Sequence, residues 1–577
     1  MIPLQFKKYL ILLFLFSNLI FSQKKNKFNI IGNRYIDTKT YIESLEKLNE
    51  ITFAKVEKNL TKLLNDRGFY NFKLNEIKTD SLKLPNKIEY NIFLNEGEAS
   101  FLTKINVEAE TKDDSLKTKK ILLSLLDRPF IKKELESSIS NILSYYENNG
   151  YPFAKVKVKS IIFDNTKGQN EVQIFLKLLK NNLTGIDEIK ITGNNKTNDK
   201  VILNNLNLKR GEVYSQKKID EISSRLNRLR FFNNIKEPKY YLSSKNKGVL
   251  EIELEERNTN SFDGLIGYVP SRNNNDGHLT GFIKINLRNL FGTGRAVSIN
   301  WKQEDKLSQE MFLKYLEPYL FNYPLNLNFE FFQRRQDSSF VKRIIGGSLE
   351  FLADKNISGS LILESETIIP SVDVENIFQS SSFNTGLKIK LDYRDNFYFP
   401  KSGVLFETEY KFKKKKINPD KTLPNYIGTN LEYHNYELDF SLYYSLFTRQ
   451  VAAVGLHAKE ILGDYFDASD FYRLGGTNTL RGFRENQFLG NRILWSNIEY
   501  RFLLSPTSFI FSFYDIGYFL IKADKFNEVE RKSNINTGFG LGISLNTAMG
   551  ILSVSYAFTK GTSLTSGLLH IGIRNDF

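Results

Sequence analysis

The pattern of apolar and polar positions changes near residue 256. Before this point, segments with helical periodicity alternate with short segments of alternating apolar and polar residues, and the arrangement repeats. After it, the helical period is lost, and alternating runs of about ten residues follow one another with turn residues between them. The pattern therefore predicts α+β repeats followed by an all-β region.

Three repeats are expected before residue 257, each with a helix, a glycine or aromatic corner, and two strands. The helices are Asn49–Asp66, Pro129–Asn148 and Ser215–Arg230. The strands that follow them are, in chain order, Lys73–Lys78, Ile88–Leu94, Ala154–Phe163, Glu171–Leu179, Ile235–Leu242 and Gly248–Glu255. The last repeat opens with the alternating strand Ile186–Gly193 and a first helix at Asn194–Lys209, whereas the beginning of the first repeat is unclear.

The all-β region contains about sixteen predicted strands, an even number, as bacterial membrane barrels require. They are Ser261–Val269, Gly277–Leu287, Ala296–Gln303, Glu310–Tyr315, Leu325–Arg334, Val341–Leu352, Ser358–Ser365, Phe383–Tyr393, Val404–Phe412, Asn430–Phe447, Val451–Leu462, Arg492–Leu504, Ser508–Leu520, Thr537–Leu545, Ile551–Phe558 and Leu568–Phe577. A soluble β-sandwich is the alternative. It does not need the aromatic residues that gather at strand ends, such as Tyr315, Tyr443 and Tyr500, whereas the interfacial girdles of a membrane barrel do.

The first 22 residues have the pattern of a secretory signal peptide. Lys7 and Lys8 form a basic start, an apolar run follows, and Ser22 with Gln23 offers a cleavage point. A membrane anchor is the alternative, but the apolar run is short for a spanning helix, which needs about 20 residues. No later segment reaches that length either. We expect an exported chain whose membrane part is built from strands.

Composition excludes several kinds of site. The chain of 577 residues has no Cys and only 4 His, which excludes disulfides and thiolate metal sites and makes a histidine metal centre a poor hypothesis. The formal net charge is +15, but the lysines are spread along the chain and no nucleic-acid motif accompanies them. A glycine-rich phosphate loop and a catalytic triad are also missing from the sequence. We therefore expect neither an enzyme nor a cofactor, and no nucleic-acid partner.

The segment Phe471–Phe488, FYRLGGTNTLRGFRENQF, interrupts two strand-like runs. Gly475 and Gly476 allow backbone turns that other residues resist. Arg481 lies between apolar Leu480 and the pair formed by Gly482 and Phe483, so a charge is carried on an apolar tip. Such a tip is expected to insert into an enclosed place where a carboxylate meets the guanidinium. The alternative is a solvated hairpin loop.

The sequence LRGF within RLGGTNTLRGF resembles the inward-folded loop of the outer-membrane assembly factor family. These are the BamA/TamA-type, or bacterial surface antigen, proteins, and in length this chain is closest to the TamA-type members. The resemblance implies periplasmic POTRA repeats followed by an all-β transmembrane barrel of about 16 antiparallel strands. The implied domains are a signal peptide at 1–22, a first POTRA-like domain at 23–98, POTRA domains at 99–180 and 181–257, and the barrel at 258–577.

The same resemblance implies roles for residues outside the loop. Carboxylates at the positions of Glu499 and Asp515 are the expected partners of Arg481, and they lie on successive predicted strands. The segment DYRDNFYFPKSG resembles another shared barrel motif. Its Arg394, which lies between Asp392 and Asp395 in the sequence, is expected to be buried and paired, and its Pro400 and Gly403 are expected to form a turn. No chemistry is expected of these groups, which would fix the loop and stabilise the barrel.

The two ends of the barrel are the other candidate site. The first strand carries Gly264 and Gly267 and ends at Pro270, and the last strand carries Gly572 and ends at Phe577. Glycine weakens a strand and proline cannot donate to a ladder, so this seam is a candidate lateral gate. An ordinary closed barrel is the alternative.

The family resemblance implies an assembly factor that receives unfolded outer-membrane or surface proteins on POTRA edges and inserts them through the gate. A secretion pore of the two-partner type, exporting one dedicated substrate through the lumen, is the alternative. The expected location is the outer membrane, with the N-terminal domains in the periplasm. The expected partners are unfolded clients, the lipid bilayer, and periplasmic or inner-membrane assembly proteins that the POTRA domains would bind.

Overall fold

The computed structural model describes residues 26–81, 88–165, 170–269, 278–303, 306–371, 374, 377–418, 428–523, 530–547, 550–563 and 565–574. The predicted signal segment Met1–Ser22 and the gate residues Pro270 and Phe577 lie outside the described residues. The chain forms two compact units. The first comprises Met1–Glu188, Arg210–Asp220 and Leu242–Val249, and the second comprises Ile189–Lys209, Glu221–Tyr241 and Leu250–Phe577.

The first repeat contains two helices and a three-stranded sheet in the order β1-β3-β2. Its elements are β1 (Lys27–Ile31), α2 (Thr38–Leu45), α3 (Phe53–Asn65), β2 (Lys73–Ser81) and β3 (Ile88–Asn95). The side chain of Asp37 caps α2 by accepting from the Thr40 N–H. Val56, Leu60 and Leu64, spaced four residues apart, bury one face of α3. The strand β1 and the helix α2 form the beginning that the sequence pattern did not resolve.

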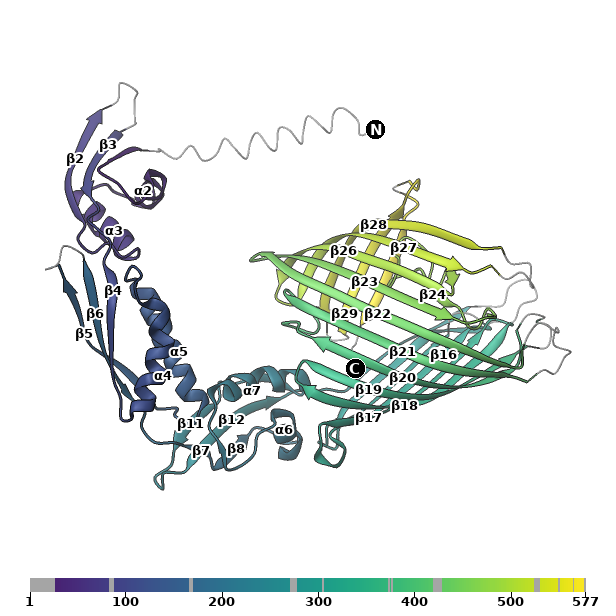
Figure 1. The fold of residues 1–577 in the computed structure, drawn as a ribbon. Coiled ribbons are helices and arrows are strands. Elements are labelled where there is room, and N and C mark those ends of the chain that lie inside the picture. The colour runs from purple at the N-terminus through teal and green to yellow at the C-terminus, as the bar shows by residue number, and fades with distance from the viewer. Residues whose placement is uncertain are drawn as a thin grey trace. The chain divides into compact units, whose positions relative to one another are not determined.

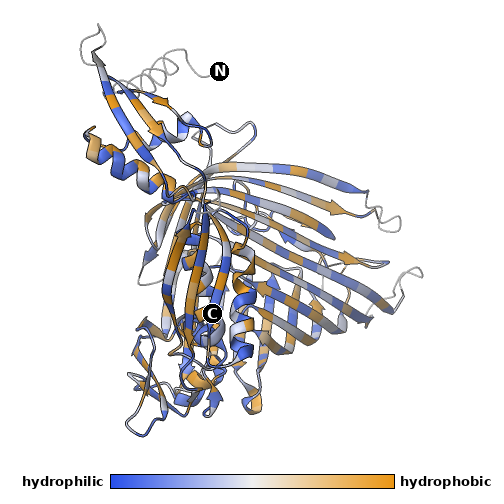
Figure 2. Cartoon of the chain, turned by 60° about the vertical axis from the view of Figure 1, so that its left-hand side comes forward, coloured by the Kyte–Doolittle hydropathy of each residue, from blue (hydrophilic) through white to orange (hydrophobic). Residues whose placement is uncertain are grey.

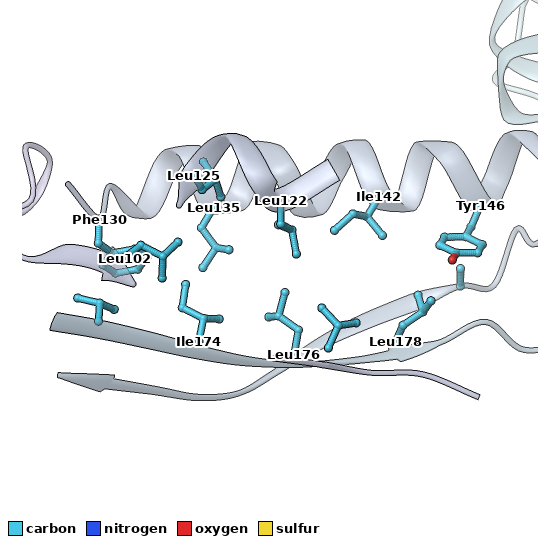
Figure 3. Packing of buried hydrophobic residues seen from close by; sticks show 13 residues of the cluster. Leu102, Leu122, Leu125, Phe130, Leu135, Ile142, Tyr146, Ile174, Leu176 and Leu178 are labelled. Atoms are coloured by element: carbon cyan, nitrogen blue, oxygen red, sulfur yellow. The ribbon is translucent and has the colours of Figure 1, made fainter. Parts of the chain in front are cut away.

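The second repeat has the same plan, with the sheet order β4-β6-β5. Its elements are β4 (Phe101–Glu108), α4 (Lys112–Leu122), η1 (Leu123–Leu125), α5 (Lys132–Asn148), β5 (Lys155–Asp164) and β6 (Glu171–Leu179). Figure 3 shows its core, where Leu122 and Ile142 of the helices pack against Ile174 and Leu176 of the central strand. Alternate residues of β6 are buried, as its sequence pattern predicts.

The third repeat contributes to both units. Its elements are β7 (Gly185–Ile186), β8 (Glu188–Thr192), α6 (Asp199–Leu206), β9 (Glu212–Val213), α7 (Gln216–Leu229), β10 (Phe232–Ile235), β11 (Lys239–Leu242) and β12 (Gly248–Glu256). Helix α6 is shorter than the predicted Asn194–Lys209, because Asn198 caps its start and Asn207 ends it in a left-handed conformation. Among the described helices, none combines enough length with enough apolar character to cross a membrane.

The second unit also contains an antiparallel sheet of 16 strands, which confirms the predicted fold class. Its strands are β13 (Ser261–Val269), β14 (His278–Leu290), β15 (Arg295–Gln303), β16 (Gln309–Glu317), β17 (Leu325–Gln336), β18 (Phe340–Asp354), β19 (Ile357–Pro370), β20 (Ser380–Asp392), β21 (Gly403–Ile417), β22 (Asn430–Phe447), β23 (Gln450–Leu462), β26 (Arg492–Ser505), β27 (Ser508–Ile521), β28 (Lys532–Thr547), β29 (Gly550–Thr559) and β30 (Leu568–Arg574). Figure 1 shows that the sheet curls into a barrel.

The barrel strands alternate between apolar and polar residues, which appears as banding along the ribbons in Figure 2. Several strands are longer than the sequence pattern predicted. The clearest case is β21, which was expected to end at Phe412 but continues to Ile417 through a run of four lysines. The strand continues because Lys413 and Lys415 face the lumen, where they are paired with carboxylates.

Candidate functional site: an inward loop and the barrel seam

The candidate loop leaves β23 and returns to β26 through a two-stranded hairpin of β24 (Tyr472–Leu474) and β25 (Phe488–Gly490). Gly475 and Gly476 have φ angles of 118° and 105°, in the region that favours glycine. Leu480 is fully buried, and a Cβ on Gly517 of β27 would lie 2.8 Å from its side chain. The loop is therefore folded against the inner wall of the barrel and is not a solvated hairpin.

Arg481 is held by the two carboxylates that the sequence analysis named. Its Nε and Nη2 atoms donate to Asp515 at 2.7 Å each, and its main-chain N–H donates to the same carboxylate at 3.0 Å. Its Nη1 atom donates to Glu499 at 2.8 Å. The register opposes Asn497 to Asp515, so Glu499 and Asp515 are diagonal neighbours on β26 and β27. Asn497 adds a further bond to Asp515 at 2.9 Å.

A second arginine completes this loop anchor. Arg501 donates through Nε and Nη2 to the other oxygen of Glu499 at 2.8 and 2.7 Å. Two guanidinium groups thus face two carboxylates, and the formal charges cancel. Phe513 of β27 lies under Arg481, with the guanidinium carbon 3.7 Å from the ring centroid. Sequence reasoning missed Arg501 and Phe513. Each lies two residues from a carboxylate on the same strand, and therefore faces the lumen as that carboxylate does.

The tip of the loop continues past Arg481 toward the end of the sheet. Gly482 has a φ angle of 92°, and a Cβ there would lie 3.0 Å from the Phe558 carbonyl oxygen of β29. The Gly482 N–H donates to Nε2 of His570 on β30 at 2.9 Å. Phe483 packs edge-on against Phe488 at 5.1 Å. The motif therefore contacts the last strand of the barrel as well as its wall.

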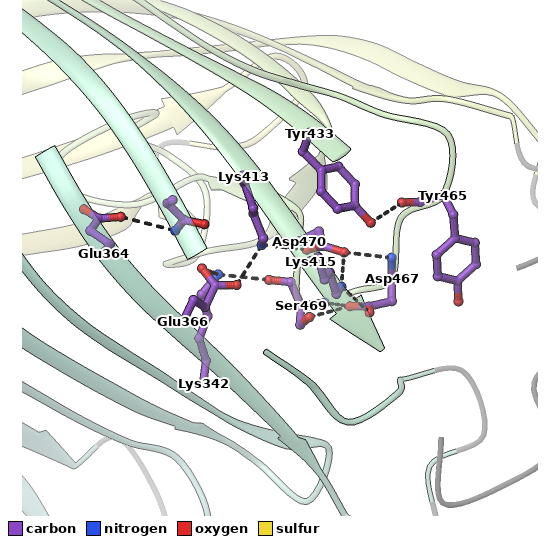
Figure 4. A network of polar contacts seen from close by, with 11 residues as sticks. Lys342, Glu364, Glu366, Lys413, Lys415, Tyr433, Tyr465, Asp467, Ser469 and Asp470 are labelled. Atoms are coloured by element: carbon purple, nitrogen blue, oxygen red, sulfur yellow. Dashed lines mark hydrogen bonds and ion pairs between the residues drawn. The ribbon is translucent and has the colours of Figure 1, made fainter. Parts of the chain in front are cut away.

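A second polar network fixes the segment before the loop, and sequence reasoning did not find it. Figure 4 shows Lys413 and Lys415 of β21 directed at Asp467 and Asp470. Lys415 lies 2.9 Å from Asp467 and 2.7 Å from Asp470, while Lys413 lies 3.1 Å from Asp470 and 2.8 Å from Glu366 of β19. A usable signal was present, since charged residues at alternate positions of a membrane strand must face the lumen.

The charges of this network also balance, because Lys342 of β18 lies 3.4 Å from Glu366. Asp470 lies in the connection between β23 and β24. Burial alone would raise the pKa of Asp470, but Lys415 and Lys413 outweigh burial and hold its pKa well below the ordinary value of 3.8. Asp470 is therefore held in its ionised form by the two buried lysines.

The motif at 392–403 lies in the connection between β20 and β21, at the opposite end of the antiparallel barrel from the loop. Arg394 binds Asp392 through two bonds of 2.9 and 2.8 Å. Asp395 accepts from the backbone N–H groups of Asn396, Lys401 and Ser402. The expected pairing of Arg394 with a carboxylate is therefore made by Asp392, whereas Asp395 is exposed and accepts from the backbone of the turn.

Other residues of this motif have geometry that suits a tight corner. Gly403 has a φ angle of 106°, and a Cβ there would lie 2.2 Å from the Tyr393 carbonyl oxygen. Pro400 is buried beside it. Tyr398 receives a hydrogen bond from Arg230, which follows α7, and the Arg230 guanidinium carbon lies 4.0 Å from its ring centroid. The motif thus contacts the third repeat within the second unit, which the sequence did not indicate.

The barrel seam lies between β13 and β30. Among the residues that the structure describes, ladders join every neighbouring pair from β13 to β30, and no ladder joins β30 back to β13. Gly264 and Gly267 lie within β13, and Gly572 lies within β30. Phe262 and Tyr268 of β13 are exposed, as are Leu569 and Ile571 of β30. Within the described residues, the seam strands thus present apolar side chains outward and share no ladder.

The lumen of the second unit holds a cavity of about 1050 Å³. Charged side chains of the inner barrel face line it, including Lys314, Lys388, Lys411 and Glu409. Across the part of the chain that the structure describes, His, Asp and Glu do not form a group that could hold a metal ion. The described residues thus supply ion pairs, a seam without a joining ladder and a charged cavity.

Comparison with known proteins places this fold in a family. A model described as the Omp85 superfamily domain matches residues 289–573, and one described as the surface antigen variable number repeat, or POTRA, matches residues 184–257. The chain belongs to the Omp85 family of outer-membrane assembly factors. It is an outer-membrane protein with periplasmic POTRA domains.

Two curated relatives are outer membrane protein assembly factors BamA. The one from Neisseria meningitidis serogroup B is 24% identical over 312 residues, covering 53% of this chain and 38% of the relative. The one from Nitratidesulfovibrio vulgaris is 22% identical over 598 residues, covering 91% of this chain and 71% of the relative. The match to the Neisseria protein thus spans well under half of that protein's length.

Among solved structures, CdiB from Escherichia coli resembles this chain with a TM-score of 0.50 and 13% identity. The match covers 91% of this chain and 98% of CdiB. At this level of identity the likeness shows the fold alone.

Proposed function

We propose that the protein inserts outer-membrane β-barrel or surface proteins into the membrane through a lateral opening between β13 and β30. The observation that carries this proposal is the seam, where two neighbouring strand edges share no ladder among the described residues. In lipid, an unpaired edge is costly because no water satisfies its N–H and C=O groups. An incoming client strand satisfies these groups by pairing with β13.

The repeats supply a place for unfolded clients to bind. Strand β5 is an edge strand of the second repeat, and its side chains are largely exposed. Val158, Ile162 and Phe163 are among the exposed apolar residues on it. An edge of this kind accepts an extended peptide as an added strand, with side-chain contacts of low sequence specificity. The repeats would hold clients in an extended form before insertion, and they are also the proposed docking place for assembly partners.

The energy for insertion would come from the client. Burying an apolar barrel surface in lipid and closing its ladder are favourable without nucleotide hydrolysis. The role of this protein would be to provide a paired edge at each step, which lowers the cost of bringing unpaired backbone into the membrane. We propose no covalent step, and therefore no enzymatic activity.

The second candidate is a two-partner-type secretion pore that exports a dedicated substrate through the lumen. The charged cavity of about 1050 Å³ favours it. Against it, such pores carry two receptor repeats and an N-terminal plug helix, whereas here the first repeat occupies the plug's place in the chain. The inward loop, anchored at Arg481, also lies inside the lumen that a substrate would have to cross.

Reconstitution separates the two candidates. The purified full chain is placed in liposomes, and a urea-unfolded eight-stranded barrel protein is added from outside. Folding of the client is followed by its heat-modifiable migration in gels. We expect faster client folding than in liposomes that carry an equal amount of an unrelated porin. Equal rates in the two preparations would overturn the insertase proposal, and protease protection of an unfolded passenger inside the liposomes would favour the pore.

A further inference from the structure

His570 connects the inward loop to the last strand of the barrel. It lies on β30, faces the lumen and is 7% exposed. Its Nε2 atom accepts from the Gly482 N–H at 2.9 Å, and its Nδ1 atom lies 3.4 Å from the Thr477 hydroxyl. A neutral ring with its hydrogen on Nδ1 satisfies both contacts, accepting from the loop backbone and donating to the hydroxyl. Both ring nitrogens therefore contact the loop.

The contacts of two adjacent loop residues reach five consecutive strands. Arg481 binds Glu499 of β26 and Asp515 of β27. The Arg481 carbonyl oxygen approaches β28 so closely that a Cβ on Gly538 would lie 1.8 Å from it. Gly482 then contacts β29 and donates to β30. The loop tip thus crosses the inner face of the sheet from the anchored wall to the seam.

The described part of the last strand is paired with one neighbouring strand, β29. Its ladder to β29 runs from the pair Ala557 and Leu568 to the pair Ile551 and Arg574, and on its other side no ladder joins it among the described residues. The outward-facing Leu569 and Ile571 are exposed on the barrel surface. The strand β30 is therefore attached in two ways, by its ladder to β29 and by the contact of His570 with the loop.

We propose that His570 is the positioning residue through which the inward loop holds β30 at the seam. Breaking the bond between Gly482 and His570 frees β30 to move away from the loop, while the anchor at Arg481 keeps the loop on the wall. This inference rests on the proposed lateral opening, since it names the contact that regulates it.

The test measures the seam directly in the purified full chain without client. Because the native chain has no Cys, the double variant Tyr268→Cys and Leu569→Cys accepts one spin label at each position. Pulsed electron paramagnetic resonance then gives the distribution of distances between the two labels. We expect His570→Leu to increase the population with longer distances about two- to tenfold, the size expected for loss of one hydrogen bond. His570→Gln retains a side-chain acceptor and is expected to restore most of the wild-type distribution.

The matched control is His434→Leu, because His434 lies on β22 and its ring bonds to Tyr410. It should leave the seam distance unchanged. If His570→Leu does not fold, His570→Ala also removes the acceptor for the Gly482 N–H and serves as the second variant. A distance distribution for the folded variant that matches wild type overturns the coupling.

Client insertion in liposomes distinguishes this inference from the proposed function. A seam that opens in His570→Leu without any effect on client folding supports the coupling and overturns the lateral-insertion proposal. A seam that does not open overturns the coupling, whatever the insertion rate.

Discussion

Arg481 and Asp515 are joined by three hydrogen bonds, from the main-chain N–H, Nε and Nη2 of the arginine to one fully buried carboxylate. The carboxylate thus fixes both the backbone and the side chain of the loop tip. Charge-assisted, two-pronged bonds of this kind define geometry as well as energy. The loop is therefore held at a defined place on the inner wall.

Replacing Arg481 with Met should strongly destabilise the barrel. The change leaves Asp515 buried without its cation, and breaking a buried pair in this way costs about 3–5 kcal/mol. The measurement is the free energy of unfolding by urea in detergent. The control is Arg484→Met, three residues along the same loop, where the side chain is exposed and the expected cost is under about 0.5 kcal/mol. Equal costs for the two variants would show that the Arg481 anchor contributes little.

Phe513 should contribute to the same anchor through its ring. The change Phe513→Leu keeps an apolar side chain but removes the face on which the guanidinium lies, with an expected cost of about 1–2 kcal/mol from lost cation–π attraction and volume. In an Arg481→Met background the cation–π part of this cost should disappear. A double-mutant cycle with the same urea assay measures the coupling, and a coupling energy near zero would contradict the proposed contact.

The lysines of β21 offer a second matched pair. Lys415→Met leaves Asp467 and Asp470 facing each other without their shared cation, so we expect a cost of about 3–5 kcal/mol at neutral pH. Lys416 is the next residue and is exposed, so Lys416→Met should cost under about 0.5 kcal/mol. Thermal unfolding of the two variants in detergent compares them, and similar midpoints would contradict the role assigned to this network.

The stability of the second network should depend on pH with a defined sign. The pKa of Asp470 is lower in the folded chain than its ordinary value of 3.8, so its stabilising effect is present above that value. The effect is lost as the pH falls below about 4 toward the lower pKa of the folded state. The difference in unfolding free energy between wild type and Lys415→Met should therefore be constant from pH 8 to 5 and shrink below about pH 4. A difference that grows on acidification would have the wrong sign.

A glycine corner in the third repeat gives a prediction outside the barrel lumen. Gly193 has a φ angle of 89°, and a Cβ there would lie 1.9 Å from the Leu254 carbonyl oxygen. Gly193→Ala should therefore destabilise the β8–α6 corner by more than about 1 kcal/mol. Gly211 has a similar φ angle of 82° but open space around it, so Gly211→Ala is the control that isolates backbone strain from the steric clash.

Hydrogen exchange of the full chain measures this effect. Protection should fall in residues 189–206 of the Gly193→Ala variant and remain in the sixteen-stranded sheet. If the two alanine variants lose protection equally, backbone strain at positive φ explains the effect and the clash with the Leu254 carbonyl oxygen does not.

The strands and the partners of Arg481 could be predicted from the sequence because both depend on local pattern or on a motif. A period of two gave β13 and β22 their bounds directly. Glu499 and Asp515 lie on inward-facing positions of adjacent strands, so their convergence on the loop follows from the antiparallel register. The lumen-facing positions of Lys413 and Lys415 follow from alternation along β21. Their partners Asp467 and Asp470 could not be predicted, because they are about fifty residues away and their position depends on the path of a connection.

The contact between His570 and Gly482 was also beyond sequence reasoning. The two residues are separated by 88 positions, and only the folded path of the loop across five strands brings them together. The contact of Tyr398 with Arg230 is similar, since it joins a barrel turn to the repeat that precedes the barrel. Such pairs leave no periodic signal in the sequence. A lone histidine in a strand is more often a packed residue than one that bonds to a distant loop.

A disulfide lock across the seam tests directly whether clients pass between β13 and β30. One cysteine within Leu265–Tyr268 and one within Leu569–Ile573 can form only one disulfide in a chain without native Cys. The locked protein is compared under oxidising and reducing conditions, both for client folding in liposomes and for barrel-protein levels in cells depleted of the wild-type copy. Two cysteines within β22 form the control for oxidation itself. If clients enter the membrane through the seam, oxidation abolishes client assembly and reduction restores it. Normal assembly by the fully locked protein would contradict lateral insertion and direct attention to the lumen.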